Sequence, residues 1–569
     1  MERLSGLDAS FLYLETPTML MNVAFVAMCD ASEIPGGYSF RKLYDLIDSR
    51  TQKHPEFRRR LVDVPFNLHH PIWIDDPEFS IMNHMHQHVL PAPGSKRDFG
   101  RAVGGIMSRP LDRSKPLWEA WVIEGLENNH FALVMKFHHA VVDGISGTGL
   151  FCRLFDEEPI EHEPKVYNRS KGEKIPSKAE MLAFGLKSRM GGTKRLLNVL
   201  GDSIGGISSF IKHREQDEGV QRSRPMSAPR THFNRRIGSN RDVAFVELSL
   251  ADLKAVKNAT DSTVNDVVLG VCGGALRQYL LNKEDLPEKS LISTVPISVR
   301  KTESESATNN QVSSMWSTLA THIDDPLERL KLIHVDTKSA KDENDALGAD
   351  LLQDWAEFNT PGAFNLAVRL YTSSGLVDVL APVHNTIISN VPGPRKPLYL
   401  AGSKIEALYP LGPVMEVVGL NISLASYEDV VGFALQADAD LIADVGEIAD
   451  LIPKALHELK LASGLIAKPK KRAAAKKTAP KTTDAIVAEA DKTPSAKKET
   501  AKKTTAKKTT AKKAPVSKTT TEKTSAKKVA AKKTSATKPK KVSAKPETHS
   551  ESAPKSKPKT KATSKAPAA

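Results

Sequence analysis

The feature that most limits how this chain of 569 residues can fold is an abrupt change of composition near residue 467. Residues 468–569 carry 31 Lys and Arg against 7 Asp and Glu, and they repeat AKKTT-like units in a background of Ala, Thr, Ser and Pro. Such a segment buries too little apolar area to offset the entropy of ordering it. We therefore predict a disordered basic C-terminal tail over residues 467–569, with folding confined to the part before it.

The body that precedes the tail has a different charge and size. It holds 50 basic and 60 acidic residues, so the overall charge of +14 comes from the tail alone. A single core rarely extends beyond about 250–300 residues. We predict an N-terminal lobe over residues 1–165, a polar crossover over 166–240 and a C-terminal lobe over 241–466.

In the first half, short apolar runs alternate with polar breaks over residues 11–30 and 115–145. This pattern is typical of strands joined by turns, here with Asn128 and Asn129 between two runs. From Ser146 onward the apolar spacing becomes helical. The sequence HHAVVDG therefore falls in a turn between a strand and a helix.

The second half repeats the mixture of elements. Residues 243–250 resemble a strand, and residues 265–281 have the apolar spacing of a buried helix. Residues 417–438 alternate like a hairpin that turns at Glu428 and Asp429. Strands and helices thus interleave in both halves, which predicts an α+β (α/β-like) fold.

Several classes of protein are disfavoured. Cys29, Cys152 and Cys272 form no CxxC pair, which argues against a disulfide framework and a thiolate zinc site. No run of 18 apolar residues is present and the N-terminus lacks the pattern of a secretion signal. We expect a cytoplasmic protein with at most peripheral membrane contact. One segment, residues 181–210, mixes apolar and basic residues and could lie on anionic lipid or pack as a helix on the body.

The pair His138 and His139, followed by Asp143 and Gly144, has the clearest chemical meaning in the chain. An imidazole with a pKa of about 6.5 is mostly neutral at pH 7 and can take a proton from an alcohol. Asp143 could fix an imidazole tautomer or hold the turn, and Gly144 permits a tight backbone. Neighbouring residues on a strand point to opposite faces, so one histidine acts and the other packs.

HHAVVDG resembles the HHxxxDG signature of the CoA-dependent acyltransferase superfamily, which includes chloramphenicol acetyltransferases and condensation domains. The surrounding body is similar to the bacterial wax ester synthase/diacylglycerol acyltransferase family over nearly all of residues 1–465. The segments that carry this similarity are LSGLDASFLYLE, SRPLDRSKPLWEAWVIEGL, VNDVVLGVCGGALRQYL, VPISVR, SNVPGP and GLNISLASYEDVVGFALQAD.

The resemblance implies transfer of a fatty acyl group from acyl-CoA to diacylglycerol, or also to a long-chain alcohol, without an acyl-enzyme. His139 is implied as the general base and Asp143 as a structural partner of the histidine turn. Acyl-CoA is a substrate, so no cofactor is implied. Two further motifs are implied near the substrate channel, namely Pro116, Leu117 and Trp118, and Asn265 and Asp266.

The implied fold is two chloramphenicol-acetyltransferase-like lobes with a tunnel between them. The family often carries a histidine after a Pro-Met pair near the N-terminus, whereas this chain has Asn22 in the sequence PTMLMNV. The difference bears on substrate preference more than on activity.

Other candidate residues favour structural roles. His84, His86 and His88 alternate on one strand, a geometry open to a metal, but no local carboxylate or cysteine accompanies them, and we predict no metal site. His69 and His70 lack the following Asp-Gly, and Cys152 reads as a small apolar residue.

The tail attracts polyanions because of its charge density. We favour an anionic membrane, the inner face of the plasma membrane or a lipid droplet, over nucleic acid. A solubilising appendage is an equal alternative. A condensation-type enzyme is disfavoured because no carrier or adenylation segment is present, and a catalytically idle binding protein is disfavoured by the intact HHAVVDG.

Overall fold

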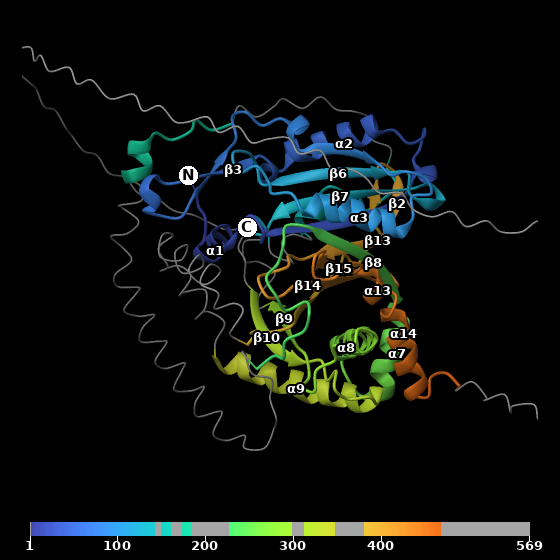
Figure 1. Cartoon of the computed structure of the whole chain (residues 1–569). Coiled ribbons are helices and arrows are strands. Elements are labelled where there is room, and N and C mark those ends of the chain that lie inside the picture. The colour runs from blue at the N-terminus through green and yellow to red at the C-terminus, as the bar shows by residue number, and fades with distance from the viewer. Residues whose placement is uncertain are drawn as a thin grey trace, which may run out of the picture. The chain divides into compact units, whose positions relative to one another are not determined.

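The structure of the protein, a computed structural model, describes residues 2–142, 149–160, 172–183, 227–298, 312–347 and 381–467. Within these ranges the chain forms two six-stranded sheets and one three-stranded sheet, with helices packed against them (Figure 1). The predicted α+β class is confirmed. The basic tail and most of the segment 181–210 lie outside the described residues, as do Asp143 and Gly144.

The first sheet has the order β12-β13-β2-β7-β6-β5 and is antiparallel except where β5 runs parallel to β6. β2 and β7 form its centre, with Asn22 opposite His138. The predicted turn between β6 and β7 contains Asn128 and Asn129, and both lie in the left-handed backbone region that asparagine tolerates. The strands are β2 (Asn22–Asp30), β5 (Met85–Val89), β6 (Trp118–Glu124), β7 (His130–His138), β12 (Tyr399–Leu400) and β13 (Ser403–Leu411).

Two strands of the first sheet come from near the end of the body. β13 pairs with β2 between Ile405 and Leu411, and β12 pairs with β13. Residues 399–411 belong to the segment predicted as the C-terminal lobe. A piece of that segment therefore completes the sheet that carries the histidine pair.

Helices and a small sheet accompany the first sheet. The strand predicted to start at residue 11 is wrong for its first residues, because α1 (Gly6–Leu14) occupies them. Ser5 caps this helix by accepting from the Asp8 amide, and Ala9 and Leu12, three residues apart, are buried. The other elements are α2 (Phe40–Lys53), α3 (Lys96–Met107), β1 (Glu2–Arg3), β3 (Arg59–Val62) and β4 (Ile72–Asp75), with short 3-10 turns at Ala31–Glu33, Pro55–Phe57, Pro65–Asn67, Ile81–Asn83 and Glu127–Asn129.

The second sheet has the order β10-β9-β11-β14-β15-β8, with β11 parallel to both β9 and β14 and the other pairs antiparallel. β14 and β15 form the predicted hairpin, and Glu428 in its turn has a positive φ. The strands are β8 (Arg241–Ser249), β9 (Ile292–Ser298), β10 (Val312–Thr318), β11 (Thr386–Val391), β14 (Leu420–Tyr427) and β15 (Val430–Asp438).

Helices accompany the second sheet (Figure 1). Their side chains and those of the strands form the largest apolar cluster of the described residues. α8 is the predicted buried helix; Thr263 and Asp266 cap its start reciprocally, and thirteen of its residues are buried. The helices are α7 (Leu250–Thr260), α8 (Val264–Asn282), α9 (Pro326–Leu347), α13 (Gly446–Ala449) and α14 (Ile452–Ala462). No helix in the described ranges is both long and apolar enough to cross a bilayer.

The two large sheets are joined by close backbone contacts. A Cβ on Gly100 of α3 would come within 2.0 Å of the Val243 carbonyl oxygen of β8, and one on Gly432 of β15 within 2.3 Å of the Leu408 oxygen of β13. Only glycine permits such an approach. The backbones of α3 and of β13 in the first sheet thus lie close to strands β8 and β15 of the second sheet.

Candidate active site

The histidine pair lies where the central strand β7 ends. The His138 amide donates to the Leu117 carbonyl at 3.0 Å, and the His139 amide donates to the Met21 carbonyl at 2.7 Å. The Val141 amide donates back to the His138 carbonyl at 2.9 Å. Hydrogen bonds to segments beside β6 and β2 therefore fix the backbone on both sides of the pair.

His138 is the packed member of the pair. Its side chain is 1% exposed, and its Nδ1 atom accepts the Ala140 amide at 3.0 Å. Its Nε2 atom lies 3.6 Å from a carboxylate oxygen of Glu15, the residue that follows α1. This separation is slightly longer than a direct hydrogen bond, so the contact is mainly electrostatic.

His139 is half-buried and lies against α1. The Phe11 ring stacks on its imidazole, with 4.0 Å between ring centroids and 20° between planes. Phe11 also contacts an apolar cluster drawn from both halves of the body, which contains Met19, Met21, Ile237 and Val414. Phe11 therefore connects His139 to apolar side chains from both halves of the body.

Glu15 is held by Arg113. The Arg113 guanidinium donates to the Glu15 carboxylate through Nε at 3.1 Å and also through Nη2, and Nη2 donates to the Leu12 carbonyl at 2.9 Å. Burial alone would raise the pKa of Glu15, but the contacts with His138 and Arg113 outweigh it and lower the pKa below its usual 4.5. Glu15 is therefore a carboxylate at neutral pH.

Two further polar residues, Lys136 and Asn22, lie near the same end of β7. Lys136 is fully buried, donates to the carbonyls of Ile106 and Arg109 at 3.1 and 2.6 Å, and lies 3.6 Å from Glu119. Burial lowers its pKa. Asn22, opposite His138, donates to the same Arg109 carbonyl at 3.1 Å, and its buried Oδ1 atom has no hydrogen-bond partner among the described residues. The position where this chain departs from the family pattern thus lies directly beside the histidine pair.

The motif Pro116, Leu117 and Trp118 supports the histidine turn from β6. The Leu117 carbonyl holds the His138 amide, and Trp118 donates its indole N–H to the Phe57 carbonyl at 2.7 Å. All three residues are buried. Their observed contacts are therefore structural.

Asn265 and Asp266 lie in the first turn of α8. The Asp266 carboxylate accepts from the Thr263 amide at 2.8 Å, from Nδ1 of His334 and from the hydroxyl of Thr337, both at 2.7 Å. Burial would raise the pKa of Asp266, but these bonds outweigh it and lower the pKa below its usual 3.8. The observed partners of Asp266 join α8 to α9.

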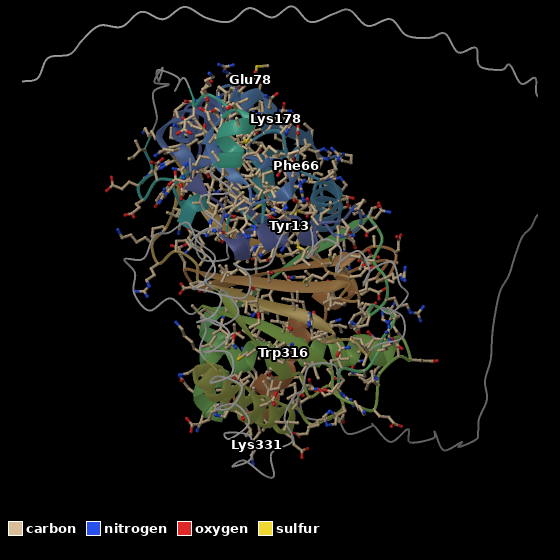
Figure 2. All side chains as sticks on the ribbon, turned by 90° about the vertical axis from the view of Figure 1, so that its left-hand side faces the viewer. Tyr13, Phe66, Glu78, Lys178, Trp316 and Lys331 are labelled. Atoms are coloured by element: carbon tan, nitrogen blue, oxygen red, sulfur yellow. The ribbon has the colours of Figure 1, made fainter. Side chains whose placement is uncertain are left out.

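The other sequence candidates pack structurally. Nδ1 of His84 lies 2.8 Å from the Trp118 carbonyl, and burial lowers the pKa of His84. His86 lies against the Trp121 ring, and Nδ1 of His70 lies 2.9 Å from the Tyr13 hydroxyl, on the face shown in Figure 2. The part of the chain that the structure describes holds no group of three side chains able to bind a metal. Burial raises the pKa of the Cys152 thiol to about 11, which disfavours it as a nucleophile.

Sequence reasoning did not single out Phe11 and Glu15, which lie against the histidine pair, or Arg113, which holds Glu15. Phe11 and Glu15 lie in the opening segment LDASFLYLE, and Arg113 lies three residues before the PLW motif. The available signal was Glu15 itself, a single acidic residue at the end of the apolar run FLYL. It gave no indication of which cation or imidazole it would meet.

Comparison with known proteins shows which family the chain resembles. The wax ester synthase/diacylglycerol acyltransferase catalytic domain matches residues 4–268, and the WS/DGAT C-terminal domain matches residues 308–460. A Mycobacterium tuberculosis protein with the provisional name diacylglycerol O-acyltransferase is 38% identical over 81% of this chain and 90% of its own length. Another protein from that species is 33% identical over 82% of this chain and 97% of its own length. The solved wax ester synthase/diacylglycerol acyltransferase of Marinobacter aquaeolei matches with a TM-score of 0.58 and 29% identity, over 81% of this chain and all of that one.

Proposed function

The chain belongs to the wax ester synthase/diacylglycerol acyltransferase family and is an acyl-CoA-dependent acyltransferase, and we propose that it makes triacylglycerol by acylating diacylglycerol. The observation that carries this proposal is the half-buried His139, held by backbone hydrogen bonds beside apolar side chains from both halves of the body. A long-chain alcohol is the second acceptor, which would give a wax ester.

His139 acts as the general base in this proposal. Its Nδ1 atom is buried, so we assign the proton transfer to Nε2. Nε2 takes the proton of the acceptor hydroxyl while that oxygen attacks the thioester carbonyl. The tetrahedral intermediate then collapses, the carbon–sulfur bond breaks, and the imidazolium returns the proton to the CoA thiolate. The acyl group passes directly to the acceptor, so no acyl-enzyme and no cofactor take part.

We also propose a division of labour over the chain. The lobe of residues 1–165 supplies the histidine pair, with Asp143 and Gly144 completing its turn, and the lobe of residues 241–466 closes the site through the cluster around Val414. Residues 166–240 connect the lobes. Acyl-CoA and the acceptor reach His139 from opposite sides through the predicted tunnel.

We expect triacylglycerol to be the main product when the purified chain receives labelled palmitoyl-CoA with equal amounts of diacylglycerol and hexadecanol. The names of the relatives support this choice of acceptor. Separation of the labelled lipids measures both products at once. If the wax ester is the main product, the preferred acceptor is a long-chain alcohol. If neither triacylglycerol nor wax ester forms, the proposal is contradicted.

The tail is proposed to bring the enzyme to its lipid substrate. Its excess of Lys and Arg should bind an anionic membrane or lipid-droplet surface at very roughly 1 kcal/mol per lysine near the surface. The enzyme would then lie peripherally on the cytoplasmic side of such a surface. The alternatives are binding to nucleic acid and a solubilising appendage.

Truncation after Ala467 is expected to leave acyl transfer to detergent-dispersed diacylglycerol unchanged, because the site lies wholly in the body. Sedimentation with anionic vesicles should fall sharply and that with neutral vesicles should not change. Loss of transfer in detergent would contradict the division between body and tail. If truncation leaves sedimentation with anionic vesicles unchanged, and only the full chain binds nucleic acid, the result favours the nucleic-acid alternative.

A further inference from the structure

α1 contacts both histidines of the pair. Phe11, on its last turns, stacks on His139, and Glu15, directly after its last residue, faces His138. We propose that Glu15, held by Arg113, is a positioning residue that acts through His138 to fix the turn that presents His139. The inference rests on the proposed role of His139 and adds to it a charged group outside the HHAVVDG motif.

The hydrogen bonds of His138 determine which of its nitrogens carries the proton. Nδ1 accepts the Ala140 amide at 3.0 Å, so this nitrogen offers its lone pair. In a neutral imidazole the proton then lies on Nε2, which faces the Glu15 carboxylate at 3.6 Å. A negative charge there favours this tautomer. The opposite tautomer would set two N–H groups of His138 and Ala140 against each other.

Glu15 can perform this role because it is ionised and fixed. Its pKa is lowered despite burial, its side chain is 11% exposed, and Arg113 binds it through two nitrogens. Arg113 also holds the carbonyl of Leu12, so the end of α1 is anchored by the same guanidinium. The carboxylate therefore keeps its place relative to the His138 ring.

The link to His139 runs through the backbone. The bond from the Ala140 amide to the His138 ring spans residue 139, and the His139 amide is bound to Met21 at the same time. Rotation of the His138 ring would release the Ala140 amide and let the turn move. Small displacements of a base from its working position can cost orders of magnitude in rate. Glu15 thus affects the base without touching the substrate.

The start of β7 supplies a matched control. There Nε2 of His130 lies 2.7 Å from a carboxylate oxygen of Glu406, a closer contact than that between His138 and Glu15. This pair is more exposed, with the Glu406 side chain 49% exposed. Glu406→Gln and Glu15→Gln therefore make the same chemical change at the two ends of one strand.

The test is a double-mutant cycle in the full chain, with kcat and KM measured for palmitoyl-CoA. Glu15→Gln is expected to lower kcat about 10-fold with little change in KM. His138→Asn keeps an oxygen near the Nδ1 position to accept the Ala140 amide and removes the nitrogen that faces Glu15. We expect Glu15→Gln to have little further effect in the His138→Asn background, because residues that act as one unit are not additive.

Two further variants complete the design. Glu406→Gln is expected to keep the wild-type kcat. Arg113→Gln is expected to lower kcat in the same direction as Glu15→Gln, and its half-exposed side chain makes a folding defect less of a concern. Thermal midpoints of all variants separate loss of fold from loss of positioning.

The outcomes separate the inference from the proposed function. A Glu15→Gln enzyme as fast as Glu406→Gln, while His139→Ala is inactive, would overturn the inference alone. Multiplying effects of Glu15→Gln and His138→Asn would also overturn it, because the two residues would then act independently. An active His139→Ala enzyme would overturn the proposed function together with the inference that rests on it.

Discussion

Replacement of His139 by alanine is expected to lower kcat for acyl transfer by at least about 10²-fold, which equals roughly 2.7 kcal/mol of activation barrier. The loss follows from removing the only proposed acceptor for the hydroxyl proton, since an unassisted alcohol is a poor nucleophile toward a thioester. The KM for palmitoyl-CoA should change little, because a general base acts mainly in the transition state. Steady-state transfer of labelled palmitate to diacylglycerol measures both constants.

His86→Ala is the control for this prediction. His86 is a partly buried histidine of the edge strand β5 in the same sheet, and its ring lies against Trp121 of β6. It should keep the wild-type rate. Because His139 is half-buried, its substitution should leave the thermal midpoint nearly unchanged. An unchanged kcat in a folded His139→Ala enzyme would exclude His139 as the base.

The sequence predicted the local elements well where apolar runs end at turn residues or at a helix cap. The strands β6 and β7, the hairpin of β14 and β15 and the helix α8 all lie where such runs were found, and β7, β14 and β15 are buried on both faces. The pairing of β13 with β2 could not be predicted, because these strands lie far apart in the chain and no local pattern names a partner. α1 was mistaken for a strand because its apolar residues are nearly continuous, although Ser5 and Asp8 give a helix start.

In the candidate site, too, the sequence predicted the local motif but not the contacts between distant segments. HHAVVDG gave the catalytic hypothesis from sequence, whereas Glu15 and Arg113 become neighbours only when α1 packs beside the end of β7. Asp266 illustrates the converse. Its motif implied a place near the substrate channel, but the sequence TVND also has the spacing of a helix cap, which the structure shows together with the bond to His334.

Two neighbouring strands of the second sheet, β8 and β15, are joined by a buried ion pair. An Nη1 atom of Arg241, at the start of β8, lies 3.3 Å from a carboxylate oxygen of Asp438, at the end of β15, and the side chains are 2% and 0% exposed. Burial raises the pKa of Asp438 and lowers that of Arg241, so each charge depends on its partners. The Asp438 carboxylate also accepts the amides of Gly238, Asp440 and Leu441 at 2.7, 3.1 and 3.1 Å.

Asp438→Ala is expected to lower the free energy of unfolding by about 3–5 kcal/mol, because it leaves the Arg241 charge buried without its counterion. Guanidinium unfolding of the full chain measures the loss. Asp45→Ala, which breaks the exposed pair of Arg41 and Asp45, is the control and should cost less than about 1 kcal/mol. Replacing both partners, with Arg241→Met and Asp438→Leu, should recover part of the stability, since the uncompensated charge disappears.

The same substitution connects stability with the active site. Arg241 also donates to the Thr18 carbonyl, three residues before Met21, whose carbonyl holds the His139 amide. If Asp438→Ala lets the guanidinium move, the loop that leads to Met21 loses an anchor and kcat should fall together with stability. If Asp438→Ala lowers the free energy of unfolding by less than about 1 kcal/mol, other groups or water compensate the charge of Arg241. In that case kcat should remain at the wild-type value, because the Thr18 contact would be intact.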